Sequence, residues 1–293
     1  MLSIDLEFAL AKDFQKNGSG SVQILDTYSV SGGSINDCFK VKTNSGSFFL
    51  KVNSAITYPG MFEAEFKGLS LLSAATGLTI PKPLFLGESG KDAYLIIEYL
   101  ENGPQGQEFW QSFGSALAKM HRNTQEQFGL DHNNYIGSIP QSNIMHSSWA
   151  EFFIQERLEV QLKRARDRNK IGADVLLRME KLFHHIDGLF PEEPPSLLHG
   201  DLWSGNFLCG VDGKACIFDP AVYYGHREMD IGMSKLFGGF DPQFYNAYNA
   251  EWPLGDDWEG RIDIANLYPL LVHVNLFGGG YLAQVRSILQ RFT

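Results

Sequence analysis

The chain has 293 residues, 44% of them hydrophobic and 20% charged, a composition typical of a folded globular protein and unlike that of a disordered one. The formal net charge is −10, and an acidic surface repels phosphate backbones, so we expect no nucleic-acid partner. The N-terminal residues lack a basic start and a long apolar run, and no segment approaches the length of a membrane span, which predicts a cytoplasmic protein with no signal peptide and no membrane partner.

The first hundred residues have the pattern of a β-rich unit. Apolar and polar residues alternate in three segments separated by turns, which predicts three consecutive antiparallel strands at 22–29, 37–43 and 47–52. Residues 61–74 follow with apolar side chains at helical spacing, which predicts a helix. Residues 93–99 are an apolar run too short for a typical helix, and we expect a buried strand there.

The second part of the chain has a different character. Gly103, Pro104 and Gly106 indicate a turn or linker, and the helical pattern dominates after it. We expect helices at 109–121, 149–169 and 175–189. The predicted fold is therefore α+β, with a β-rich N-terminal lobe (1–100) and a mainly helical C-terminal lobe (101–293).

The sharpest chemical signal lies between residues 197 and 220. Asp201 is followed five positions later by Asn206, the spacing of the protein-kinase catalytic loop, and Asp219 ends a short apolar strand. Residues 206–209 and 214–218 have the pattern of a hairpin, which would bring Asn206 next to Asp219. Their oxygens suit Mg²⁺, which takes few protein ligands and completes its shell with phosphates and water. Asp201 would then accept the proton of a substrate hydroxyl.

These motifs are weak one by one, because His-Gly-Asp is a common turn and Asp-Pro a common strand end. Their combination with the hairpin predicts phosphoryl transfer from ATP with Mg²⁺.

The β-rich part offers a partner for the nucleotide phosphates. Lys51 lies in the third predicted strand, where kinases place the lysine that holds the α- and β-phosphates. Glu65 of the following helix is the expected partner of this lysine, since it lies on one stripe with Leu69 and Leu72. Glu63 remains an alternative.

Two further segments are candidates for nucleotide contacts. The turn containing Gly32, Gly33 and Ser34 does not match G-x-G-x-x-G, but its backbone N–H groups could cradle phosphate oxygens. Glu98 and Leu100 end the strand between the lobes, where backbone groups are expected to bind adenine.

The sequence resembles the fructosamine-3-kinase (ketosamine-3-kinase) family, within the aminoglycoside-phosphotransferase-like and protein-kinase-like superfamily. The most specific match is His-Gly-Asp-Leu-Trp joined to Phe-Asp-Pro-Ala-x-x-Tyr-Gly-His. The matching segments extend over nearly the whole chain: 61–65, 134–137, 198–206, 217–228, 237–240 and 273–278.

The resemblance implies a two-lobed kinase fold that phosphorylates the 3-hydroxyl of ketosamines, which leads to protein deglycation. It implies that Asp201 is the catalytic base, that Asn206 and Asp219 bind Mg²⁺, and that Lys51 and Glu65 form the ion pair that orients ATP. Trp203 would contact the sugar, or else pack beneath the catalytic loop. The expected partner is a small ketosamine or a glycated protein, and the expected state is a monomer or weak homodimer.

Other interpretations remain open. The same scaffold could phosphorylate an aminoglycoside or choline, serve as a catalytically silent nucleotide-binding protein, or act as a metal-dependent hydrolase through His199 and Asp201. Of the remaining polar residues, Asp230 is expected to cap the next helix and steady the catalytic loop, and His199 to orient that loop. The three cysteines predict buried thiols rather than a disulfide or metal site.

Overall fold

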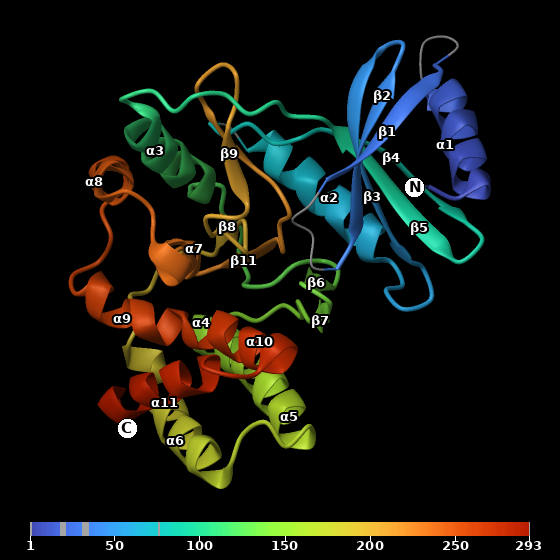
Figure 1. Ribbon diagram of the computed structural model, residues 1–293. Coiled ribbons are helices and arrows are strands. Elements are labelled where there is room, and N and C mark those ends of the chain that lie inside the picture. The colour runs from blue at the N-terminus through green and yellow to red at the C-terminus, as the bar shows by residue number, and fades with distance from the viewer. Residues whose placement is uncertain (1, 18–21, 31–34, 76, 293) are drawn as a thin grey trace.

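The computed structural model describes residues 2–17, 22–30, 35–75 and 77–292. A five-stranded antiparallel sheet forms the N-terminal part, at the upper right of Figure 1. Its strands, in the spatial order β1-β2-β3-β5-β4, are β1 (Ile24–Val30), β2 (Asp37–Thr43), β3 (Gly46–Ser54), β4 (Pro83–Ser89) and β5 (Asp92–Glu98). The predicted strands correspond to β1, β2, β3 and β5 and are confirmed. Strand β4, which begins at a proline, was not predicted. A proline is tolerated there because β4 lies at an edge of the sheet.

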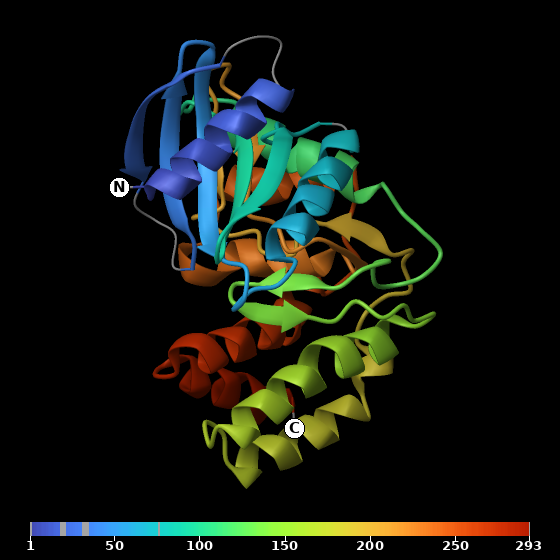
Figure 2. The ribbon, with the colours of Figure 1, turned by 90° about the vertical axis from the view of Figure 1, so that its right-hand side faces the viewer.

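Two helices cover opposite faces of the sheet (Figures 1 and 2). Helix α1 (Ile4–Asn17) was not predicted, although Leu6, Leu10 and Phe14 recur at four-residue spacing and pack against Ile96 of β5. Helix α2 (Met61–Ala74) has the predicted bounds and packs on the other face, in the cluster that includes Leu95. Successive β5 residues face opposite sides, as the pleat of a strand requires.

The remainder of the chain is mainly helical. The predicted helix at 109–121 is α3 (Phe109–His121), and the predicted run 149–169 is one continuous helical path of α4 (Trp149–Phe152), a π-helical stretch (Phe153–Glu159) and α5 (Val160–Asp167). The helix expected at 175–189 is α6 (Ala173–Phe183), followed by a 3₁₀ turn (Ile186–Gly188).

Further helices complete this part: α7 (Glu228–Lys235), a 3₁₀ turn (Leu236–Gly238), α8 (Pro242–Glu251), α9 (Trp258–Ala265), α10 (Leu267–Phe277) and α11 (Tyr281–Phe292). Three short antiparallel strand pairs connect these elements: β6 (Asn134–Ile136) with β7 (Ile139–Gln141), β8 (Ser196–Leu198) with β11 (Tyr223–Gly225), and β9 (Phe207–Cys209) with β10 (Ala215–Ile217).

The sheet and the helical part share one hydrophobic core. Phe62 of α2 and Leu95 of β5 belong to the same buried cluster as Leu117 of α3 and Phe244 of α8. A second cluster fills the lower helical part, where α5, α6, α10 and α11 lie in Figure 1. None of the helices in the described part of the chain has the length and apolar character that crossing a membrane requires.

Candidate active site

The predicted hairpin is present as β9 and β10. Cys209 pairs with Ala215 and Phe207 with Ile217, as antiparallel neighbours. The pairing continues beyond the strands, because the Phe218 amide donates to the Asn206 carbonyl over 3.1 Å. Asn206 and Asp219 therefore lie side by side at the open end of the hairpin, as the sequence pattern predicted.

Asn206 connects this hairpin end to Asp201. Its side-chain Nδ2 donates to the Asp201 backbone carbonyl over 2.8 Å and to Asp201 Oδ2 over 3.0 Å. Both amide hydrogens are used in this way, which leaves Asn206 Oδ1 available as an acceptor or metal ligand. The surrounding protein shields the Asp201 carboxyl from water and raises its pKa to about 7, although the Asn206 hydrogen bond opposes the shift.

Lys51 reaches the same place from the sheet. Its Nζ lies 2.5 Å from Glu65 Oε1 and 2.6 Å from Asp219 Oδ1, and its side chain is almost fully buried. Burial alone would lower the pKa of Lys51, but the charges of Asp219 and Glu65 outweigh burial and raise it. Glu63 is exposed on the same helix, so the structure pairs Lys51 with Glu65 rather than with the alternative.

The donor set at the hairpin end fits a magnesium ion. Asp219 has the left-handed backbone conformation (φ 56°), which an Asp tolerates better than most residues. Lys51 contacts Asp219 through Oδ1, so Asp219 Oδ2 and Asn206 Oδ1 remain as candidate ligands. No group of three or more His, Cys, Asp or Glu residues gathers at a metal-binding distance within the described residues. Such a group is not needed by Mg²⁺ that is bound mainly through phosphates and water.

Asp230 fixes the loop that carries Asp201. Its Oδ2 accepts from the His199 amide (2.7 Å) and its Oδ1 from the Gly200 amide (2.9 Å), while His121 Nε2 lies 3.2 Å from Oδ2. Gly200 has φ +81°, and a Cβ there would collide with the Ala221 carbonyl oxygen. The predicted role of Asp230 in steadying the loop is confirmed.

The helix-capping role expected of Asp230 is wrong. Helix α7 begins after Arg227 without a side-chain cap, because both Asp230 oxygens are directed to the loop instead. His199 orients the loop as expected, with its Nε2 2.9 Å from the Phe218 carbonyl. Burial lowers the pKa of His199, even though the nearby Asp230 charge raises it.

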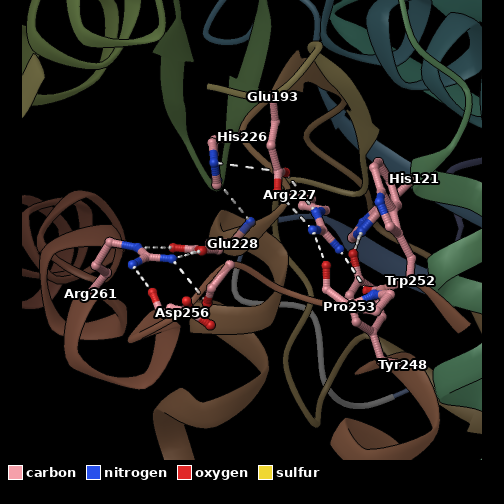
Figure 3. Close-up of polar contacts among 11 residues, drawn as sticks. His121, Glu193, His226, Arg227, Glu228, Tyr248, Trp252, Pro253, Asp256 and Arg261 are labelled. Carbon is pink, nitrogen blue, oxygen red and sulfur yellow. Dashed lines mark hydrogen bonds and ion pairs between the residues drawn. The ribbon is translucent and has the colours of Figure 1, made fainter. Parts of the chain in front are cut away.

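A buried ion network anchors the start of α7 (Figure 3). Arg227 forms two hydrogen bonds of 2.7 Å with Glu193 and donates to backbone carbonyls of residues 252–253. Glu228 accepts two hydrogen bonds from Arg261, of 3.0 and 2.6 Å. Arg227 and Glu228 belong to a family motif, but their ion-pair partners lie more than thirty positions away and could not be predicted from the sequence.

The residues of the site line one open pocket of about 220 Å³. It extends from Lys51 and Glu65 past Asp201 to Trp203 and His273. Trp203 is half-buried, and its ring centroid lies 6.0 Å from that of Phe237, an aromatic partner that the sequence analysis missed. Trp203 thus packs against protein while it also lines the pocket.

Two sets of predicted nucleotide contacts are not among the described residues that line this pocket. Gly32, Gly33 and Ser34 fall outside the described residues, although Ile35, which follows them, lines the pocket. Glu98 ends β5, and its Oε2 accepts from the Lys82 amide over 3.3 Å. Leu100 is half-buried in the segment after β5.

The cysteines are free thiols, as expected. Cys209 and Cys216 are buried, and Cys38 is half-buried next to the pocket.

Comparison with known proteins places this geometry in a family. A family model described as fructosamine kinase matches residues 8–293. A protein of Enterococcus faecium assigned as a ketoamine kinase is 40% identical over 268 residues, which cover 90% of this chain and 94% of the relative. The chloroplastic protein-ribulosamine 3-kinase of Arabidopsis thaliana is 40% identical over 278 residues, which cover 93% of this chain and 84% of that protein.

Solved structures agree with this placement. A crystal structure from Thermobifida fusca assigned to the fructosamine-3-kinases has a TM-score of 0.86 and 32% identity, covering 96% of this chain and 97% of that one. An aminoglycoside phosphotransferase solved with AMP-PNP and hygromycin B has a TM-score of 0.65 and 16% identity, over 96% of this chain and 98% of that one, and shows a shared fold only. These matches confirm the predicted α+β, protein-kinase-like fold. The chain belongs to the fructosamine kinase family.

Proposed function

We propose that the protein transfers the γ-phosphoryl group of ATP to the 3-hydroxyl of ketosamines of the fructosamine or ribulosamine type. The observation that carries the proposal is the convergence of Lys51, Glu65, Asp201, Asn206 and Asp219 on one pocket, in a chain of the fructosamine kinase family. The names of its ketoamine kinase and ribulosamine 3-kinase relatives support this substrate class.

In the proposed mechanism, Glu65 holds Lys51 in position to bind the α- and β-phosphates. Asn206 and Asp219 would hold Mg²⁺, with Asn206 also keeping Asp201 in place. Asp201 accepts the proton of the sugar hydroxyl as that oxygen attacks, and a carboxyl with a pKa of about 7 suits a proton acceptor near neutral pH. Bound ATP with Mg²⁺ supplies the transferable phosphoryl group and charge neutralisation. Most of the acceleration would come from alignment of the reactants.

The acidic groups of the pocket favour a ketosamine over a polycationic aminoglycoside. The carboxylates among its described lining residues are Glu65, Asp201, Asp219 and Asp230. Each of them is already hydrogen-bonded or ion-paired within the protein. Recognition of a polycationic aminoglycoside would call for further carboxylates. Trp203 lines the pocket and is two residues from Asp201 in the sequence. It is the proposed contact for the sugar ring.

Further parts of the proposal concern the setting of the reaction. Residues 1–100 would bind the nucleotide, with adenine at Glu98 and Leu100 and phosphates at Gly32–Ser34, and residues 101–293 would bind the acceptor. The phosphorylated adduct is expected to break down, which makes the activity a deglycation repair of free or protein-bound ketosamines. The free thiols of Cys209 and Cys216, on paired strands, are compatible with a reducing cytoplasm. A monomer or weak homodimer is the proposed state.

An ATP-consumption assay with purified protein tests the function. Fructosamine and ribulosamine adducts of a small amine are compared with an aminoglycoside and with choline, with and without Mg²⁺, and the phosphorylated position is read by NMR. We expect Mg²⁺-dependent phosphorylation of the ketosamines at the 3-hydroxyl. Turnover of only the aminoglycoside or choline would replace the proposed substrate class, and ATP binding without turnover of any acceptor would contradict a kinase.

A further inference from the structure

On the acceptor side of the pocket, helix α10 presents uncharged side chains. They are Tyr268, Pro269, Val272, His273, Leu276 and Phe277. The only Lys or Arg side chain among the described lining residues is Lys51, which belongs to the nucleotide side. A substrate cation that enters this region therefore meets apolar and aromatic surface.

Each carboxylate among the described lining residues of the pocket already has a partner in the protein. Glu65 and Asp219 contact Lys51, and Asp230 accepts the backbone amides of the catalytic loop. Asp201 is held by Asn206 and is required for the reacting hydroxyl. Recognition of a positive charge on the substrate can therefore draw on another kind of group as well.

Aromatic rings are the alternative that the structure offers. Trp203, His273 and Phe277 line the pocket, and we call these three side chains the aromatic wall. Phe237 joins two of its members, with ring centroids 6.0 Å from Trp203 and 4.6 Å from His273, and Phe277 lies 5.5 Å from His273. Tyr281 lies 4.9 Å from His273 and supports the wall from α11.

The backbone at Phe237 has an unusual conformation. Phe237 has φ 58° and ψ 42°, a left-handed conformation that is an outlier for a bulky side chain. Such strain persists where the surrounding structure enforces it, and it concentrates at functional sites. Phe277, at the end of α10, is 60% exposed although it is a large apolar side chain. Phe237 thus has a strained backbone next to the aromatic wall, and Phe277 exposes its ring to solvent at the pocket.

His273 contributes a neutral ring to the wall. Its Nδ1 lies 2.7 Å from the Pro269 carbonyl, which can only accept, so Nδ1 carries the proton and Nε2 keeps a lone pair. Burial lowers the pKa of His273, which favours the uncharged imidazole. A neutral imidazole does not repel a cation, as an imidazolium would.

Ketosamines carry a cation close to the reacting hydroxyl. Their secondary amine is protonated at neutral pH, and with bond lengths near 1.5 Å the nitrogen lies within about 5 Å of the 3-oxygen. If that oxygen is at Asp201, the ammonium lies among the pocket residues nearest to it, and Trp203 is two residues further along the same loop.

Resting on the proposed function, we infer that the aromatic wall of Trp203, His273 and Phe277 binds the secondary ammonium of the substrate through cation–π contacts. The wall thereby selects ketosamines over neutral ketoses of the same shape.

A matched pair of acceptors tests the inference. One is 1-deoxy-1-(methylamino)fructose, which carries the ammonium, and the other is the 1-O-methyl ether of fructose, in which an oxygen replaces the nitrogen. For the unaltered protein we expect kcat/KM to be about tenfold higher for the amine, mainly through a lower KM, a factor that lies between the sizes of an exposed and a desolvated cation–π contact. Phe277→Leu keeps apolar bulk but removes the π face, and should cut this preference about fivefold. Phe277→Tyr should retain it.

Phe8→Leu is the matched control, because Phe8 is an exposed phenylalanine (75%) on α1, which packs on the sheet away from the pocket. A Phe277→Leu variant that changes both acceptors by the same factor, or neither, would overturn the inference while the proposed function stands. Equal kcat/KM of the unaltered protein for both acceptors would also overturn the inference while the proposed function stands. Phosphorylation of neither acceptor would overturn the proposed function, and the inference with it.

Discussion

At Asp201, burial and hydrogen bonding act on the same carboxyl in opposite directions. Shielding from water raises its pKa to about 7, and the Asn206 amide limits that rise by stabilising the charged form. The Oδ1 atom of the same amide remains available as a ligand for the proposed metal ion. Asn206 thus orients the proposed base and limits the pKa that burial gives it.

Asp201→Asn is the direct test of that role. The amide keeps the size of the side chain but does not accept the hydroxyl proton, so we expect kcat to fall on the order of a hundredfold or more. Binding of ATP with Mg²⁺ should persist, measured as a thermal shift, because Lys51, Asn206 and Asp219 are unchanged. A variant with full turnover would show that another group accepts the proton.

At the level of elements, helix α2 presents one acid to the sheet and another to solvent. Glu65 faces inward and meets Lys51 of β3, whereas Glu63, two residues away, is exposed. Helix α7 has the corresponding task in the helical part, because Asp230 in its first turn holds the loop that carries Asp201. The two helices thus position the two sides of the site.

The same substitution at two positions, Glu65→Gln and Glu63→Gln, tests which of the two acids orients Lys51. Glu65→Gln removes the charge that holds Lys51 toward α2, and a hydrogen bond to a charged group contributes about 1.5–3 kcal/mol. We expect KM for ATP to rise about tenfold or more. Glu63→Gln should leave it unchanged, since that side chain is exposed. Equal effects in steady-state kinetics would contradict the assignment of Glu65.

In the whole molecule, the sheet and the helical part are joined by a common core, and α7 is fixed by the ion network of Figure 3. Arg227 and Glu228 are both buried and both have bidentate partners, in Glu193 and Arg261. Buried ion pairs of this kind give little net stability but strongly penalise the loss of one partner. Their effect here is to define where α7, and hence Asp230, lies.

His226 makes this network sensitive to acid. Burial lowers its pKa from 6.5 to about 4, despite the opposing charge of Glu193, whose Oε2 lies 3.8 Å from Nε2. Between pH 6.5 and about 4 the unfolded chain therefore binds a proton at His226 that the folded protein does not. The free energy of unfolding should fall as the pH falls through this window, by about 3 kcal/mol from this group.

Urea unfolding at several pH values measures that slope. His226→Gln should give a shallower loss of stability below pH 6.5, because the titrating group is gone. His184→Gln is the matched control, because His184 is exposed. It should leave the pH dependence of the free energy of unfolding unchanged. An unchanged slope in His226→Gln would show that other groups dominate the acid response.

The sequence by itself determined the chemistry and its local frame. The proximity of Asp201, Asn206 and Asp219 could be predicted because a short hairpin separates the last two. Turn residues and the alternation of apolar and polar side chains encode a hairpin locally. Helices α2 and α3 have the predicted bounds because helical periodicity is also local. The family motifs added the substrate class.

Only the tertiary structure decided the pairings between distant residues. It selected Glu65 over Glu63, directed Asp230 to the loop rather than to its own helix, and brought Phe237 and His273 together with Trp203. Such contacts depend on how whole elements pack, and a side chain has no local pattern that names its partner. Helix α1 and the edge strand β4 escaped prediction for a related reason, since burial against the sheet outweighs weak local signals.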